Sequence, residues 1–244
     1  TYGNRDHQAE DYLQQFADII TQTAHKGGAL LIPAFAVGRA QLVLYILHQL
    51  RSKNRIPSLP VYLDSPMAIN VTDVFRRFHD WHRLTDQQTE EVFRSVNYSR
   101  TVEQSMAINQ VKVPKIIVSA SGMATGGRVL HHLKLMLEDS RNSILFTGFQ
   151  AGGTRGARML EGEKQVKIHG QYYQVKAAVH NIQSLSAHAD RGGLMQWMKQ
   201  LRVAPKNIYI THGEPQAADA LRIAIQDDLG WSAMTPEHKQ TVEI

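Results

Sequence analysis

The chain has 244 residues, enough for one large or two small domains, and its 43% content of hydrophobic residues is ordinary for a globular protein. It contains no cysteine, which excludes disulfides, thiolate zinc sites and a thiol nucleophile, and which fits a reducing, cytoplasmic location. No run of about eighteen apolar residues occurs, so no membrane partner is expected. The formal net charge of +5 favours an anionic partner without identifying it.

Most of the chain predicts a series of strand–loop–helix units. Apolar residues at helical spacing predict a first helix over 8–25, which Gly27 and Gly28 end. Short apolar runs predict buried strands, each followed by a helix. The strands are expected at 29–32, 61–63, 115–119 and 143–146, and the helices after them at 40–50, from Ser65-Pro66 onward, at 128–137 and at 157–161. This alternation predicts an α/β fold with a mostly parallel sheet between helices.

The stretch 78–113 is polar, helical in part and without a clear strand. His79 and His82 lie three positions apart in it, a spacing that suits a metal pair on a helix. Because Trp81 lies between them and no third ligand is near, an ordinary surface helix is the favoured interpretation.

From residue 165 the pattern changes to β. A strand over 166–168, a turn at Gly170 and a strand over 172–179 predict a hairpin, which marks the best internal boundary. After the hairpin, the pattern predicts a helix over 194–201, a strand over 207–211, a helix over 217–228 and a strand-like tail.

Two histidines near the C-terminus are the strongest candidates for chemistry. His188 lies between Ser186 and Asp190 at a predicted strand-to-helix corner, where an imidazole can hold and move a proton. His212 ends the last short strand, and Gly213 after it is expected to let the backbone turn sharply. One strand–helix–strand unit separates the histidines, so we expect them at adjoining ends of parallel strands. One such histidine alone would be read as an ordinary loop residue.

Three predicted loops combine glycine with an arginine near the start of the next helix. Helix N-termini and arginine forks both favour anions such as phosphate. If the loops share one edge of the sheet, they form an anion-binding rim; otherwise they are only tight connections. The pairs are Gly38-Arg39, Gly127-Arg128 and Arg155-Gly156. The run 152–156 also suggests a nucleotide loop, but it lacks both the Gly-x-Gly-x-x-Gly and the Walker spacing.

Five ordered motifs resemble the β-CASP branch of the metallo-β-lactamase superfamily. These are RNA-processing nucleases related to the eukaryotic pre-mRNA 3′-end endonuclease and to ribonuclease J. The resemblance covers nearly the whole chain. The motifs lie at 32–41, 64–68, 119–132, 186–190 and 211–214.

The resemblance implies a β-CASP domain, whose mostly parallel sheet is flanked by helices, and the C-terminal returning segment of a metallo-β-lactamase αββα fold. It implies that 1–8 end the N-terminal lactamase part, that 9–162 form the β-CASP domain and that 163–244 form the returning segment. The family's His-x-His-x-Asp-His run matches nothing here, and the Glu of its Glu-Ser-Thr-Tyr-Gly motif would precede Thr1. We therefore expect the C-terminal part of a longer enzyme.

The resemblance also assigns roles by position. His188 matches a catalytic histidine near the scissile phosphate, which assists the leaving group, and His212 matches a histidine that binds one of two zinc ions. Ser186 matches a serine that holds a substrate phosphate. Arg39 and Ser121 are expected beside the RNA path, and Arg128 of the rim is expected to bind RNA with them.

The function implied is hydrolysis of RNA phosphodiester bonds, as an endo- or exoribonuclease, by a two-zinc mechanism in the full-length parent. Because this chain offers His212 and few other ligands, its zinc should be absent or partial, and the chain should be inactive alone. RNA is the expected partner, and a homodimer is left open. Two alternatives remain: a non-catalytic RNA-binding module, and a nucleotide-binding α/β domain that uses the loop 152–156.

Overall fold

The computed structural model describes residues 2–7 and 11–242. They divide into a larger unit, Asp11–Leu185, and a smaller unit made from Thr1–Glu10 and Ser186–Ile244. None of the helices in this described part of the chain is long and apolar enough to cross a bilayer.

The larger unit is built on a six-stranded sheet in which every pair of neighbouring strands is parallel. The strand order is β3-β2-β4-β1-β5-β8, so consecutive strands are joined by crossovers. The strands are β1 (Ala29–Pro33), β2 (Val61–Asp64), β3 (Asn97–Tyr98), β4 (Lys115–Ser119), β5 (Ser143–Phe146) and β8 (Ala178–Asn181). The predicted α/β class with a mostly parallel sheet is confirmed.

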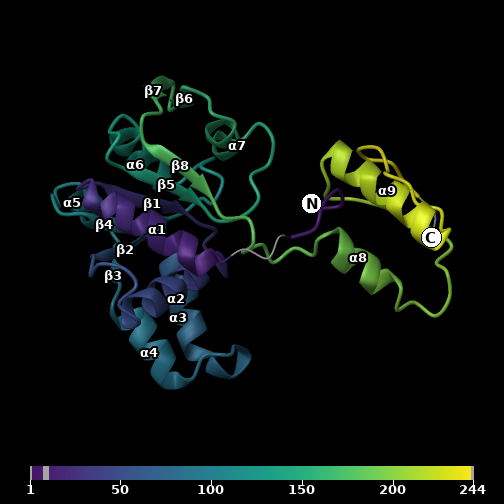
Figure 1. Cartoon of the computed structure of the whole chain (residues 1–244), viewed down its shortest axis with the longest axis horizontal. Coiled ribbons are helices and arrows are strands. Elements are labelled where there is room, and N and C mark those ends of the chain that lie inside the picture. Colours follow the sequence, from purple (N-terminus) through teal and green to yellow (C-terminus); the bar gives the residue numbers. More distant parts are fainter. Residues whose placement is uncertain (1, 8–10, 243–244) are drawn as a thin grey trace. The chain divides into compact units, whose positions relative to one another are not determined.

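Helices cover both faces of this sheet (Figure 1). On one face lie α1 (Tyr12–His25), α2 (Arg39–Ser52), α3 (Pro66–Arg77) and α4 (Asp86–Arg94); on the other lie α5 (Val102–Ile108), α6 (Val129–Met136) and α7 (Arg155–Leu160). Within β1, Leu30 and Ile32 face the first core and Leu31 faces the second. Because side chains alternate between faces, a strand buried on both sides reads as a continuous apolar run.

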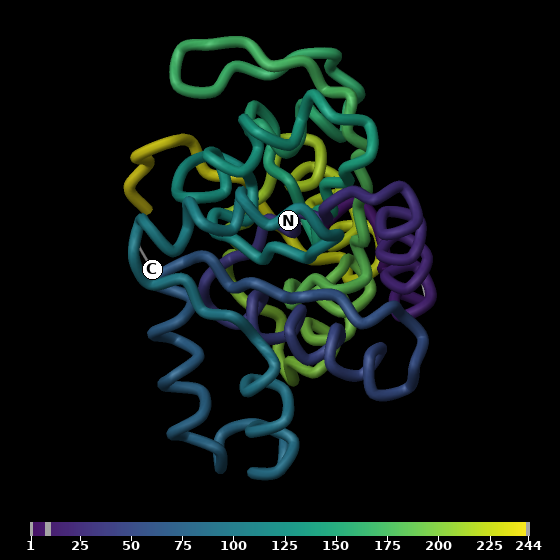
Figure 2. Tube along the Cα trace, turned by 90° about the vertical axis from the view of Figure 1, so that its left-hand side faces the viewer, coloured from purple at the N-terminus to yellow at the C-terminus, as the bar shows by residue number. Residues whose placement is uncertain are grey.

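The structure corrects two details of the predicted strands. The expected strand 172–179 is two elements: β7 (Gln171–Gln174) pairs antiparallel with β6 (Gln165–Ile168), whereas β8 joins the large sheet beside β5. The two-residue strand β3 lies in the stretch where no strand was expected, because it is too short to show a period. The β6–β7 hairpin and the pair α3 and α4 lie at opposite ends of the larger unit (Figures 1 and 2).

The smaller unit has two helices among its described residues, α8 (Arg191–Met198) and α9 (Pro215–Leu229). Its core is small: Met195, Met198, Ile210, Ala218 and Ile225. The expected strand 207–211 is reduced to an isolated bridge between Tyr209 and Met234, so the predicted strand–helix–strand arrangement is wrong.

The predicted domain ranges stay a prediction. Contacts assign 163–185 to the larger unit, because β8 completes its sheet.

Candidate functional site

The loop that carries His188 is tied to the N-terminal segment of the smaller unit. The Nε2 atom of His7 lies 2.9 Å from the backbone oxygen of His188, and the backbone N–H of His7 donates to Asp190 Oδ2 at 2.8 Å. Tyr2 is buried and packs edge-on against His7, with ring centroids 4.6 Å apart. Sequence reasoning assigned no role to His7 or Tyr2, yet this segment holds the backbone of the candidate catalytic residue.

Asp190 and Ser186 shape the same loop. Asp190 is the N-cap of α8, and its Oδ1 accepts the backbone N–H of Gly193 at 2.7 Å. The N–H donated by His7, followed by that of Gly193, lowers the pKa of Asp190 below its ordinary value. Ser186 Oγ accepts the backbone N–H of His188 at 3.2 Å, which leaves the hydroxyl proton to donate to another acceptor. The carboxylate therefore organises the loop.

The imidazoles of His188 and His212 lie side by side. Their ring centroids are 5.6 Å apart, their planes are inclined by 47°, and both residues are exposed. The two rings therefore lie together, as the sequence predicted, although no regular strand carries them in the described residues of this unit. Their catalytic and metal-binding roles stay predictions.

The backbone at His212 differs from the expectation. His212 itself has a left-handed conformation, with φ of 62°, whereas Gly213 has a negative φ. A Cβ on Gly213 would lie 3.3 Å from the Cβ of Ala218 at the start of α9, so close packing is the reason for glycine there. A non-glycine residue with positive φ is uncommon and is enriched at functional sites.

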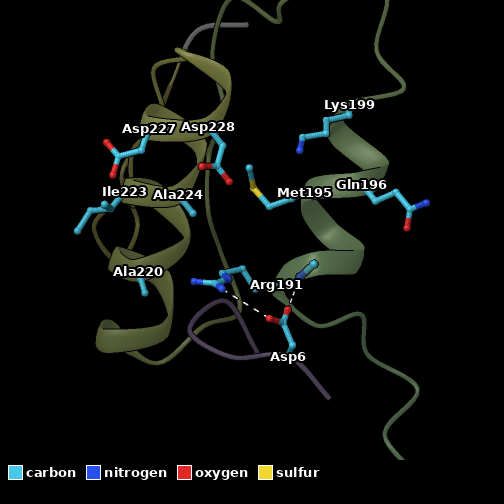
Figure 3. A pocket seen from close by; sticks show the side chains of 11 residues that line it. Asp6, Arg191, Met195, Gln196, Lys199, Ala220, Ile223, Ala224, Asp227 and Asp228 are labelled. Carbon is cyan, nitrogen blue, oxygen red and sulfur yellow. Dashed lines mark hydrogen bonds and ion pairs between the residues drawn. The ribbon is translucent and has the colours of Figure 1, made fainter. Parts of the chain in front are cut away.

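Two cavities lie beside the loops of the smaller unit. A cavity of about 410 Å³ is lined by both histidines and by apolar residues of α8 and α9. Figure 3 shows a second one, of about 700 Å³, between the same helices. There Asp6 accepts the N–H of Gly192 at 2.7 Å and lies 3.5 Å from the Arg191 guanidinium, so this carboxylate holds the start of α8 (Figure 3).

The described residues do not by themselves fit a zinc site. No group of three or more His, Asp or Glu side chains among them is placed to hold a metal, and a protein zinc site needs three or four ligands. Asp6 and Asp190 accept backbone N–H groups, and His7 contacts a backbone oxygen. His188 and His212 can supply at most part of a donor set, and the expected partial zinc occupancy stays a prediction.

His79 and His82 have other contacts. The segment His79–Trp81 forms a 3₁₀ turn rather than the expected surface helix. Both ring nitrogens of His82 are engaged: Nε2 lies 3.1 Å from the oxygen of Phe75, and Nδ1 accepts the N–H of Leu84 at 3.2 Å. This leaves His82 no ring nitrogen for a metal.

The three arginine loops lie at one edge of the large sheet, as the rim hypothesis requires. They follow β1, β4 and β5, which are neighbouring parallel strands. The three guanidinium groups, however, differ in their partners. Arg155 donates to three backbone oxygens, those of Ala124, Thr125 and Lys167.

Arg128 is not the open cation that the rim requires. Its Nη1 lies 2.8 Å from Asp64 Oδ1, and the guanidinium also donates to two backbone oxygens. Asp64 is fully buried and also binds His132 at 2.7 Å and Ser105 at 2.6 Å. Burial would raise the pKa of Asp64, but the hydrogen bonds from His132, Ser105 and Arg128 outweigh it and lower that pKa.

The spacing could have indicated this network. Arg128 and His132 lie four positions apart, so they share one face of a helix, and both reach the carboxylate that ends β2.

Ser121 and Arg39 belong to the same edge. Ser121 Oγ lies 3.2 Å from the oxygen of Gly126 and accepts the N–H of Thr125 at 3.1 Å, so it closes its own loop. Arg39 begins α2 and is half-buried. Their contact with RNA stays a prediction.

Two family descriptions match the sequence. Residues 40–159 match the Beta-Casp domain, and residues 172–236 match the Zn-dependent metallo-hydrolase RNA specificity domain.

Several curated proteins are similar to this chain. Ribonuclease TTHA0252 of Thermus thermophilus is 35% identical over 228 residues, which cover 91% of this chain and 52% of the relative. The transcription termination factor FttA of Methanosarcina mazei is 31% identical over 261 residues, covering 100% of this chain and 40% of the relative. An RNase J-like protein of Methanocaldococcus jannaschii is 33% identical over 202 residues, covering 82% and 47%. The chain thus spans about half the length of these relatives or less.

With two matched domains in this order and relatives aligned over most of its length, the chain belongs to the β-CASP family of the metallo-β-lactamase superfamily.

Proposed function

We propose that this chain is part of a zinc-dependent ribonuclease that hydrolyses RNA phosphodiester bonds. The observation that carries the proposal is the exposed pair of imidazoles, His188 and His212, with centroids 5.6 Å apart. The names of two relatives, a ribonuclease and an RNase J-like protein, support RNA as the substrate.

The roles follow from the placement of each group. His188 is the proton donor to the leaving oxygen, because its backbone is held by His7 and Ser186 while the residue stays exposed. Ser186 donates its hydroxyl proton to a phosphate oxygen, since its oxygen already accepts the N–H of His188. Asp190 holds the loop that carries both residues in place, because it caps the helix α8 that follows the loop.

We assign His212 to metal binding. Bound zinc would activate a water molecule and stabilise the negative charge that develops on the phosphate. The described residues supply too few donors for this. The relatives are about twice as long as this chain or longer, which leaves room for further donors outside the matched part.

A zinc titration and an RNA cleavage assay test the proposal on the 244-residue chain and on a longer parent protein. We expect substoichiometric zinc and no turnover from the chain alone, and zinc-dependent cleavage from the parent. Tight stoichiometric zinc with turnover in the chain alone would overturn the assignment of the missing donors. A parent that binds zinc but cleaves no RNA would overturn the proposed function.

A further inference from the structure

A cationic pocket lies in the larger unit, where the loops after β4 and β5 meet the β6–β7 hairpin. Its volume of about 570 Å³ is in the range of pockets that hold small ligands. The ionisable side chains that line it are all basic: Arg155, Arg158, Lys167 and His169. None of the lining residues is acidic, so the pocket favours an anion.

Glycines make the backbone of this pocket accessible. Gly126, Gly153 and Gly170 line it, and at each one the place of a Cβ has no heavy atom within 4 Å. Gly153 and Gly170 have φ of 78° and 86°, a backbone conformation that residues with a side chain rarely adopt. A ligand can therefore approach the chain closely at three points.

Arg155 builds the pocket. Its Nε donates to the oxygen of Lys167 at 2.6 Å, and its Nη1 donates to the oxygens of Ala124 and Thr125 at 3.2 Å each. One guanidinium therefore ties the loop after β4 to the hairpin, and its positive charge has no carboxylate partner among the described residues. A preformed site loses little entropy when a ligand binds.

An exposed aromatic ring adjoins the cations. Tyr172 of β7 is 63% exposed, and the Nζ atom of Lys167 lies 5.6 Å from its ring centroid. Proteins that bind single-stranded nucleic acids combine a basic groove with aromatic rings on which bases stack. Arg158 lies at the same pocket, although its Nε also pairs with Glu163 at 2.8 Å.

We infer that this pocket binds a phosphate group of single-stranded RNA and that the adjacent base stacks on Tyr172. The inference rests on the proposed function for its ligand class, but it requires neither zinc nor cleavage. It also gives a role to the loop 152–156, which has neither the Gly-x-Gly-x-x-Gly nor the Walker spacing.

The test measures binding of a fluorescently labelled, single-stranded RNA to the 244-residue chain over a series of salt concentrations. Replacing Arg158→Ala and Lys167→Ala together should weaken binding by about tenfold at low salt. The slope of log affinity against log salt should become shallower by about 0.7 for each RNA phosphate that the variant no longer neutralises. Tyr172→Ala should weaken binding by a factor of about ten while leaving the salt slope unchanged.

A matched control removes the same charges elsewhere. Arg141 pairs with Asp139 as Arg158 pairs with Glu163, and Lys53 is an exposed lysine at the end of α2. Arg141 precedes β5 and Lys53 follows α2, and neither residue lines the pocket. Arg141→Ala with Lys53→Ala should therefore leave affinity within a factor of about two.

Two-dimensional NMR of the same chain locates the site. The amide signals of Gly126, Gly153 and Gly170 should shift with RNA and, at higher concentration, with inorganic phosphate. Unchanged affinity and salt slope in the double variant would overturn the inference, as would RNA shifts confined to other residues or a response to phosphate alone. If the variants behave as expected but a longer parent cleaves no RNA, the pocket stands and the proposed function fails.

Discussion

The two units use their ionisable side chains in opposite ways. In the larger unit, the charged groups of Asp64 and Arg128 neutralise each other, and Asp64 and His132 are buried below helices that cover the sheet. In the smaller unit, His188 and His212 are exposed, and the backbone of His188 is held by His7 and Ser186. A charged motif residue can therefore serve the fold, whereas a motif residue held at the surface is the better candidate for chemistry.

The hydrophobic cores of the two units also differ, in size. The sheet of the larger unit is covered on both faces, and Leu31, Ile117 and Ile144 have exposures of 0–1%. The smaller unit has a core of a few residues, and Trp197 on α8 is 67% exposed. The first unit is therefore stabilised by an extensive core on both faces of its sheet, whereas few side chains form the core of the second.

The largest expected effect is at Asp64. Asp64→Ala leaves the half-buried Arg128 and the buried His132 without their carboxylate, so the free energy of unfolding should fall by about 3–5 kcal/mol. Urea denaturation measures it. The control is Asp139→Ala, which removes the partially exposed partner of Arg141 and should cost about 0.5 kcal/mol or less. Equal losses in the two variants would contradict the distinction between a buried network and a surface pair.

Acid should weaken the same network. Because the pKa of Asp64 is lower in the folded protein than in the unfolded chain, its contribution is complete above about pH 4. That contribution is lost as the pH falls through the lower, folded-state pKa. The stability difference between the wild type and Asp64→Asn, measured by urea denaturation from pH 7 to pH 3, should therefore shrink on acidification. A constant difference would show that Asp64 does not titrate with a lowered pKa.

Gly3 tests the packing of the smaller unit. A Cβ on Gly3 would overlap the backbone oxygen of Ala217 and lie 2.8 Å from the Cβ of Leu221. Gly3→Ala should therefore destabilise this unit by about 1–3 kcal/mol, seen as faster hydrogen exchange in α9. Gly126→Ala in the larger unit is the control, because no atom lies within 4 Å of the new Cβ. Unchanged exchange in the Gly3 variant would contradict this packing.

The smallest expected loss of stability comes from replacing the N-cap residues of two helices. Asp190 caps α8 and Asp11 caps α1, each accepting a backbone N–H from the first turn. Either Asp→Ala change should cost about 1 kcal/mol. Only Asp190→Ala should shift the NMR signals of the His188 ring, because Asp190 also binds the backbone of His7. Equal shifts from Asp11→Ala would show that the His188 loop does not depend on its own cap.

The sequence predicted what depends on local pattern. Buried strands such as β1 and β4 were found because both of their faces are apolar. The pairing of His188 with His212 was predicted from motifs, and the structure brings the rings together.

What depends on distant partners could not be predicted. The spacing of Arg128 and His132 could indicate a shared partner, but it does not identify Asp64, which is 64 positions away from Arg128 in the chain. RNA binding by Arg128 stays a prediction. The expected strand 172–179 is divided between two sheets. Between β7 and β8, the backbone N–H groups of Lys176 and Ala177 donate to the oxygen of Leu137 instead of to a neighbouring strand. The left-handed backbone conformation of His212 could not be predicted either, because histidine rarely adopts it.

The central claim is that His188 and His212 are one site with two roles. It is tested most directly by measuring zinc content and RNA cleavage in a longer parent that carries either His→Ala change. We predict that His212→Ala loses zinc and all activity, whereas His188→Ala keeps its zinc and cleaves about 10²- to 10⁴-fold more slowly. An equal loss of zinc in both variants would contradict the division of roles, and full activity in either one would contradict the site.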